Sequence, residues 1–244
     1  MKTGPYHLAE GVFACLSDDR FVFMDLRRNR YLCLNRRHSR AAAGNFGGFQ
    51  DHDGGPPRDS DNTGRADCDA TDAVLTALSN RGLLSSGDVN GKVALPVRAR
   101  TVNRSLLSVG DPRDTDFRYG HLAAFVRASL AAAGKLCWQS MHRSVRGVSA
   151  RRRKRGHLPA ADGGELGELV AVFHHLRPLY GRKYHCLFDS LALLEFLARY
   201  RCFPHWVFAV RSAPFAAHCW VQHGDCVLND TVENVRGYTP IMVA

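Results

Sequence analysis

The chain has 244 residues, of which 45% are hydrophobic and 23% are charged, a composition typical of a globular protein with at least one core. Its formal net charge of +10 suits an anionic partner, but the basic residues lack zinc-finger spacing, a helix-turn-helix pattern and aromatic interleaving, so we expect no nucleic-acid binding. No apolar run approaches the length of a membrane span, and the first residues lack an apolar signal segment, which predicts a cytoplasmic protein outside the membrane.

Residues 12–34 alternate between apolar, β-prone stretches and polar turns. The apolar stretches are 12–16, 21–26 and 31–34, and charged or polar residues separate each from the next. The pattern predicts an antiparallel meander of three short strands, which needs a helix to cover its apolar face.

Two helices are expected after this meander. Asn35 is the predicted N-cap of a short helix over Arg36–Ala43. Residues 44–67 are rich in Gly, Asp, Asn and Pro, which predicts a mobile insertion. A second helix is expected to begin at Asp69 or Thr71. The apolar residues expected on one face of this helix are Val74, Leu75, Leu78 and Leu83.

These elements predict a first domain over residues 1–84. Residues 85–115 show no clear period and contain Gly, Pro and Ser, which predicts a linker. Residues 116–244 form the predicted second domain, whose helical spacing is interrupted by Gly147 and by the basic run at 151–155. We interpret that run as a solvated loop or as a docking patch for an anionic partner.

Eight cysteines occur in a chain that we expect to meet a reducing compartment, where no disulfide framework forms. No CxxC pair is present and the spacings do not match a structural zinc site, so we expect no metal and no cofactor. A metal site built from His174, His175, His185 and nearby cysteines is the weaker alternative, because adjacent histidines face different ways on a helix.

Cys186 opens a strongly helical segment over residues 187–200. A thiol in the first turn of a helix lies near free backbone N–H groups and the positive end of the macrodipole, which favour the thiolate. The same N–H groups could stabilise an oxyanion on an attacked carbonyl. The position therefore predicts a nucleophile.

His218 and Asp230 complete the candidate site. They lie at the ends of two predicted strands, and a hairpin turn at 223–225 would bring their side chains together. His218 would then accept the thiol proton of Cys186, and Asp230 would fix its orientation, as in a catalytic triad. This order of elements is that of transglutaminase-like and papain-like cores.

Other cysteines lie nearby, and a cysteine is more often a small buried hydrophobe than a nucleophile. Cys219 neighbours His218 on a strand and is expected to point to the opposite face. Cys202 follows a helix C-terminus, where the dipole disfavours the thiolate, and Cys226 lies on a strand without a helix dipole. Position favours Cys186, but from the residues alone a structural role for it stays open.

Three motifs in the second domain resemble those of the lasso-peptide leader peptidases, the maturation B proteins with a transglutaminase-like fold. The family patterns are C-L-x-x-S-L, F-x-x-H-x-W-V and N-D, and the chain reads CLFDSL, FAAHCWV and ND in the same order. The resemblance implies Cys186 as nucleophile, His218 as general base and Asp230 as the acid. The chain departs from the family in Cys219, where Ala is usual, in Gln222, where Glu is common, and in Phe203, where Gly is frequent.

The first domain resembles the small precursor-recognition domain, similar to the pyrroloquinoline-quinone chaperone, that binds leader peptides in many ribosomal-peptide pathways. The resemblance implies a winged-helix-like unit to which the leader adds as a strand, between the third strand and the last helix. The residues expected to form this groove are Arg30, Tyr31, Leu32, Cys33, Leu34, Val74 and Leu78.

The sequence thus predicts an α+β protein, a small three-stranded antiparallel sheet with helices followed by a transglutaminase- or papain-like cysteine peptidase domain. The implied function is cleavage of leader from core in a ribosomally made lasso precursor, before an ATP-dependent, asparagine-synthetase-like cyclase closes the macrolactam. Two alternatives stay open. One is a transglutaminase-like acyltransferase, because an amine can resolve the same thioester. The other is a non-catalytic precursor-binding scaffold.

Overall fold

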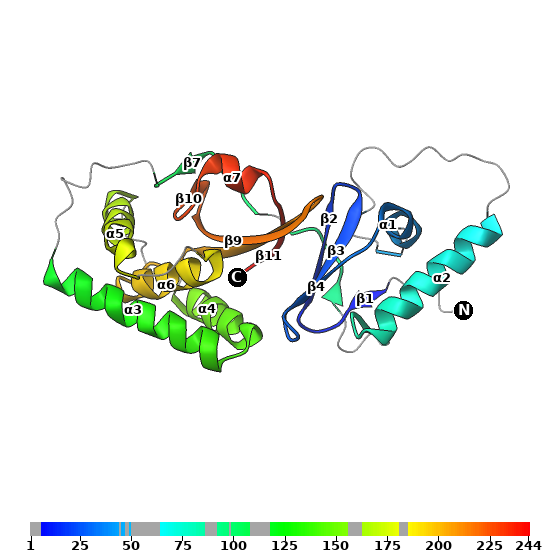
Figure 1. Cartoon of the computed structure of the whole chain (residues 1–244), viewed down its shortest axis with the longest axis horizontal. Coiled ribbons are helices and arrows are strands. Elements are labelled where there is room, and N and C mark those ends of the chain that lie inside the picture. The colour runs from blue at the N-terminus through cyan, green and yellow to red at the C-terminus, as the bar shows by residue number, and fades with distance from the viewer. Residues whose placement is uncertain are drawn as a thin grey trace. The chain divides into compact units, whose positions relative to one another are not determined.

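The computed structural model describes residues 6–43, 45–46, 49, 64–85, 92–97, 99–107, 118–155, 163–180 and 185–244. The chain divides into two compact units, which are described separately below (Figure 1). Unit 1 comprises residues 1–98 and 210–216, and unit 2 comprises residues 99–209 and 217–244.

Unit 1 contains the predicted meander. Strands β2 (Val12–Ser17), β3 (Arg20–Asp25) and β4 (Arg30–Cys33) form an antiparallel sheet in the order β2-β3-β4. Asp18 and Asp19, between β2 and β3, adopt left-handed backbone angles, with φ of 46° and 60°. Asp tolerates that region better than most residues, so a tight polar turn forms where the sequence predicted one.

Two helices accompany this sheet. Helix α1 (Arg36–Ala43) has its predicted bounds, and the Asn35 side chain accepts a hydrogen bond from the His38 N–H at 2.8 Å, as expected of an N-cap. Helix α2 (Gly64–Asn80) begins earlier than the expected Asp69 or Thr71. The Thr71 hydroxyl donates to the carbonyl of Ala41 at 3.2 Å, so it ties α2 to α1 instead of capping α2.

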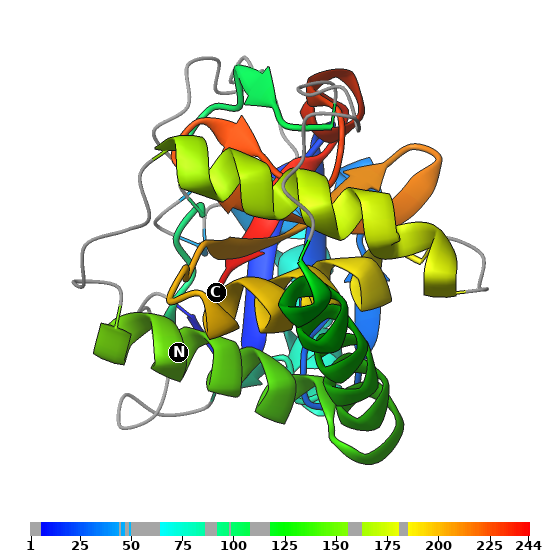
Figure 2. The same ribbon diagram turned by 90° about the vertical axis from the view of Figure 1, so that its left-hand side faces the viewer.

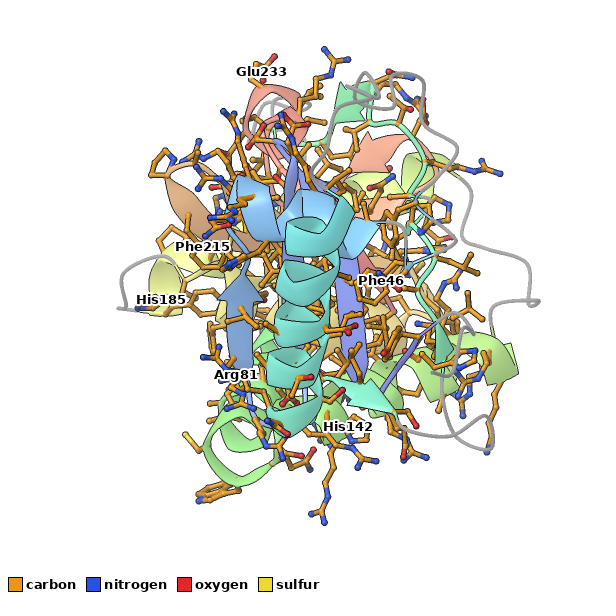
Figure 3. All side chains as sticks on the ribbon, turned by 90° about the vertical axis from the view of Figure 1, so that its right-hand side faces the viewer. Phe46, Arg81, His142, His185, Phe215 and Glu233 are labelled. Carbon is orange, nitrogen blue, oxygen red and sulfur yellow. The ribbon has the colours of Figure 1, made fainter. Side chains whose placement is uncertain are left out.

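The core of unit 1 lies between α2 and the sheet (Figure 3). Phe21 and Phe23 of β3 are fully buried there, together with Leu75 and Leu78 of α2. Phe46 also belongs to this core and packs at 5.4 Å from the Phe21 ring. The prediction of a mobile insertion over 44–67 is therefore wrong at Phe46 and at the first turn of α2, and its remaining residues lie largely outside the described ones.

A second small sheet in unit 1 has the order β5-β1-β6 and is antiparallel throughout. Its strands are β1 (His7–Leu8), β5 (Leu84–Ser85) and β6 (Lys92–Val93). Strand β6 comes from the segment predicted as a linker and pairs with β1. Residues 210–216, the tip of a hairpin, also belong to unit 1, where Ser212 donates a hydrogen bond to Asp18 at 3.0 Å.

Unit 2 is built around a sheet with the order β11-β8-β9-β10-β7. Strand β7 runs parallel to β10, whereas β9 and β10 are antiparallel. Its inward side chains, such as Val207, Ala209 and Trp220, are buried. The strands are β7 (Arg104–Ser105), β8 (His205–Ser212), β9 (Phe215–His223), β10 (Cys226–Val227) and β11 (Thr239–Val243).

Helices α3 to α6 gather on one side of this sheet, with α6 most deeply buried (Figure 2). Both α3 and α5 pack against α6, and the short helix α7 follows the β10 strand. The helices are α3 (Tyr119–Trp138), α4 (Met141–Arg155), α5 (Gly163–Leu176), the 3-10 helix η3 (Arg177–Tyr180), α6 (Cys186–Arg199) and α7 (Val232–Arg236).

The basic run does not interrupt the helical part of unit 2, in contrast to the prediction. Residues 151–155 form the last turns of α4, which also passes through Gly147 without a break. Arg151 donates to Glu195 of α6 at 2.8 Å, and Lys135 of α3 contacts the same carboxylate at 2.6 Å. Because the Glu195 side chain is only 10% exposed, this cluster ties three helices together. Arg153, Lys154 and Arg155 are exposed, and a docking role for them stays a prediction.

The structure confirms an α+β protein with small antiparallel sheets. The winged-helix-like character of unit 1 and the boundaries at 84 and 115 stay predictions. In the part of the chain that the structure describes, no helix is both long and apolar enough to cross a membrane.

Candidate active site

Cys186 is the first residue of α6, and packing of that helix fixes its place. Eight of the residues over Asp189–Leu197 are buried, so the helix has little freedom to shift. The N-cap residue, His185, makes no side-chain cap hydrogen bond. Backbone N–H groups of the first turn therefore stay near the thiol of Cys186, where a helix N-terminus favours negative charge.

His218 and Asp230 meet where the β9–β10 ladder ends. Val227 pairs with Gln222, and the ladder continues as the Leu228 N–H donates to the Val221 carbonyl at 2.9 Å. Continued in this register, the ladder would set Asp230 opposite Cys219, but it ends after Leu228, where the Asn229 side chain accepts from the Val221 N–H. Past this point His218 Nε2 hydrogen-bonds to Asp230 Oδ2. Since Nε2 is occupied by the carboxylate, Nδ1 is the ring nitrogen left for a thiol.

Asp230 is held by other groups besides His218. The backbone N–H of Thr231 donates to one carboxylate oxygen at 2.7 Å, and the side chain of Asn234 in α7 donates to both oxygens at 3.0 Å. Burial raises the pKa of Asp230, but the hydrogen bonds from His218, Asn234 and Thr231 outweigh that effect and lower it. The carboxylate therefore stays ionised and oriented toward the imidazole.

The thiol of Cys186 is strongly acidified. Its hydrogen bond to the Cys219 side chain lowers the pKa most, burial opposes this, and the hydrogen bond and charge of His218 lower it further, to about 4. Burial lowers the pKa of His218, but hydrogen bonds to Asp230 and Cys186 outweigh burial and raise it to about 9. Between these values the two side chains form a thiolate–imidazolium pair.

Cys219 takes part in the site, a role that no sequence pattern indicated. Strand alternation predicted that its side chain points away from His218, and hydrogen bonding from its side chain and backbone lowers the pKa of Cys186. Cys219 is buried against α6, where its thiol also approaches the Ser190 hydroxyl at 3.9 Å. The role of Cys219 was missed because strand alternation does not indicate that α6 brings Cys186 within reach of both His218 and Cys219. Asn234 was likewise missed, although it follows Asp230 by only four residues, a local spacing that could have indicated the contact.

Replacing Cys219 with Ala, the residue usual in the resembled family, is expected to raise the pKa of Cys186 from about 4. A hydrogen bond to the thiolate stabilises the charged form, so its loss favours the neutral thiol. The rate of alkylation by iodoacetamide against pH measures this, with its midpoint moving to higher pH in the variant. Cys226→Ala, at another buried cysteine, serves as control. An unchanged midpoint in Cys219→Ala would contradict the hydrogen bond.

The predicted leader-binding residues fall into two groups in unit 1. Arg30 to Cys33 form β4, at an edge of the β2-β3-β4 sheet, and Leu34 follows it. Arg30 reaches the C-terminal end of α2, donating to the Arg81 carbonyl at 3.0 Å. Val74 and Leu78 are residues of α2 whose side chains are buried in the core of unit 1. A peptide at the edge of β4 would therefore meet other residues of α2.

Side chains of β4 alternate between two environments. Leu32 packs on the core beneath α2, whereas Tyr31 packs against Phe215, with ring centroids 5.8 Å apart. Phe215 is 48% exposed and belongs to the hairpin tip that unit 1 includes. In the described residues, no three His, Cys, Asp or Glu side chains gather as they would around a metal ion. The seven cysteines whose side chains the structure describes are free thiols.

The comparison with known families agrees with a thiol-dependent site in unit 2. Residues 126–243 match the transglutaminase-like superfamily. They form a transglutaminase-like domain. Domains of this kind are compatible with cysteine protease or acyltransferase chemistry, and the Cys186, His218 and Asp230 cluster lies within the matched residues. No curated protein and no solved structure matched the chain.

Proposed function

We propose that the chain is a cysteine endopeptidase that binds the leader of a ribosomally made lasso precursor and cleaves leader from core. The observation that supports it best is the acidified Cys186 thiol beside an imidazole that Asp230 orients. The three sequence motifs around these residues, which resemble the lasso leader peptidases, support the choice of substrate.

In the proposed reaction the Cys186 thiolate attacks the carbonyl carbon at the end of the leader. The first-turn N–H groups of α6 stabilise the oxyanion, and His218 transfers its proton to the departing amine of the core. A water molecule, deprotonated by His218, then hydrolyses the thioester and frees the leader. Asp230 stays ionised and holds the imidazole throughout.

Unit 1 supplies the proposed leader-binding surface at the edge of β4. The Leu34 N–H donates to Phe21 of β3 at 2.8 Å, so alternation along the strand directs the N–H of Cys33 away from β3. Within the described residues, β4 has a strand neighbour on one side only. A leader added there as a strand would accept a hydrogen bond from Cys33.

Cys33→Pro is expected to weaken leader binding by ~1 kcal/mol, about fivefold in Kd, because proline removes one outward-facing donor. Pairing with β3 does not use that N–H, so the sheet should remain folded. Fluorescence anisotropy with a labelled leader peptide measures the effect. Cys33→Ala, which keeps the backbone donor, is the control, and equal affinities of the two variants would argue against strand addition at β4.

The proposal is tested by incubating the precursor peptide with the full chain and reading the products by intact mass. A single cut that releases leader and core supports the peptidase. Leader joined to an added amine would indicate the acyltransferase instead. Binding without turnover, even with the ATP-dependent, asparagine-synthetase-like cyclase that we propose as the next enzyme, would indicate a scaffold.

A further inference from the structure

Asn229, the residue before Asp230, is 1% exposed and bridges two elements of the candidate site. Its side-chain oxygen accepts a hydrogen bond from the Val221 N–H of β9 at 2.8 Å. Its side-chain nitrogen donates to Asp189 at 2.9 Å and to the Ser190 hydroxyl at 3.0 Å, both in α6. The Asn229 carboxamide therefore joins β9 to α6, and the Asn229 backbone is bonded directly to Asp230.

The partner of Asn229 in α6 is itself anchored. Asp189 is 2% exposed, and its second carboxylate oxygen lies 2.8 Å from Nε of Arg177 in η3. Burial raises the pKa of Asp189, and Arg177 and Asn229 oppose that rise. A buried carboxylate with a fixed cation on one side and an amide donor on the other has little freedom to reorient. The bridge is therefore rigid on both sides.

We propose that Asn229 is a positioning residue that holds Cys186, His218 and Asp230 in register, a role that rests on the proposed cysteine chemistry. Cys186 lies three residues before Asp189 on α6, and His218 lies three residues before Val221 on β9. The Asn229 side chain hydrogen-bonds to both elements close to Cys186 and His218, and its backbone continues into Asp230. Shifts of about 1 Å between reacting groups are costly in rate, so a fixed register has a large effect on turnover.

The chemistry of the bridge requires a group that both donates and accepts. Asn229→Asp keeps the shape and the acceptor for Val221, but it places a second carboxylate opposite Asp189. Adding Asp189→Asn restores a donor to that contact, now directed from residue 189 to residue 229, and returns the net charge to that of the wild type. An acceptor oxygen also remains at residue 189 for Arg177. The double variant thus reverses the contact without removing it.

The experiment compares wild type, Asn229→Asp and Asn229→Asp/Asp189→Asn in the full chain. Iodoacetamide alkylation of Cys186 against pH reports on the thiolate without any peptide substrate, and precursor cleavage gives kcat and KM. We expect Asn229→Asp to move the alkylation midpoint to higher pH and to lower kcat about 100-fold with KM unchanged. The double variant should recover about tenfold of kcat and shift the midpoint back.

Ser190→Ala provides a second variant if Asn229→Asp fails to fold. It removes one of the two acceptors of the Asn229 amide and should lower kcat several-fold, with KM unchanged. The assignment would be overturned if folded Asn229→Asp or folded Ser190→Ala kept the wild-type kcat and alkylation midpoint. A double variant that recovers no activity would overturn it as well. A wild-type protein that cleaves no precursor would instead overturn the proposed function, because the alkylation profiles test Asn229 independently.

Discussion

Replacing Cys186 with Ala is expected to reduce precursor cleavage by about four to six orders of magnitude, as loss of the covalent nucleophile does in enzymes with a catalytic triad. No other described thiol combines a helix N-terminus with a neighbouring imidazole. Burial is the largest cause of the raised pKa of Cys219, and burial also raises the pKa of Cys226. A substitute nucleophile is therefore absent from the described residues around the site.

The same variant should bind the leader with unchanged affinity, since the proposed binding strand β4 lies in unit 1 and Cys186 lies in unit 2. Cleavage is followed by intact mass and binding by anisotropy with a labelled leader. Cys137→Ala, at an exposed thiol on α3, is the matched control and should cleave at the wild-type rate. Loss of both cleavage and binding in Cys186→Ala would point to misfolding, and retained cleavage would exclude Cys186 as nucleophile.

Replacing Asp230 with Asn is expected to lower kcat by about two to four orders of magnitude. The carboxylate accepts from His218 Nε2, and an amide in its place no longer stabilises the imidazolium or selects the tautomer that leaves Nδ1 for Cys186. Asn234, which donates to both carboxylate oxygens, would meet an amide that offers one acceptor fewer. The orientation of the imidazole should loosen as a result.

The pH dependence of kcat/KM should also change in Asp230→Asn, in a direction set by the charge of Asp230. In the wild type, kcat/KM should rise with an apparent pKa of about 4, as Cys186 ionises, and fall with one of about 9, as His218 loses its proton. Removing the negative charge of Asp230 lowers the pKa of His218, so the upper limb should move to lower pH in Asp230→Asn. An upper limb that stays in place, or moves to higher pH, would contradict the assigned role of Asp230.

The local elements of unit 1 could be predicted from sequence because their signals are local. Alternating apolar residues and polar turns identify β2, β3 and β4, and the Asn35 side chain marks the start of α1 at the expected residue. That His218 and Asp230 lie near each other could be expected from the hairpin, since its turn brings the end of the second strand to the start of the first. Their hydrogen bond also depends on the end of the ladder, where the Asn229 side chain accepts from the Val221 N–H.

The features that sequence reasoning missed depend on contacts between distant residues. The basic run at 151–155 looked like a breaker of helical spacing because its partner, Glu195, is 44 residues from Arg151. Phe46 looked like part of an insertion because the phenylalanines that it packs against lie in β3. Contacts of this kind leave no periodic trace in the chain.

The same limit applies inside the candidate site. Alternation on β9 correctly separates neighbouring side chains, but it does not say that α6 brings Cys186 within reach of both His218 and Cys219. The bridge from Asn229 to Asp189 spans 40 residues and involves a position that the sequence motifs leave variable. Helix-on-sheet packing therefore determines much of the electrostatics of the site.

Covalent catalysis by Cys186 is tested by acid quenching of the full chain during precursor turnover, followed by intact-mass analysis of the protein. Attack by the Cys186 thiolate predicts a transient thioester that carries the leader, with the core already released, and hydrolysis in ¹⁸O-labelled water predicts one labelled oxygen at the new leader terminus. Peptide mapping should place the adduct on Cys186, and Cys186→Ala should show none. Cleavage that leaves no adduct on the protein and persists in Cys186→Ala would contradict covalent catalysis by Cys186.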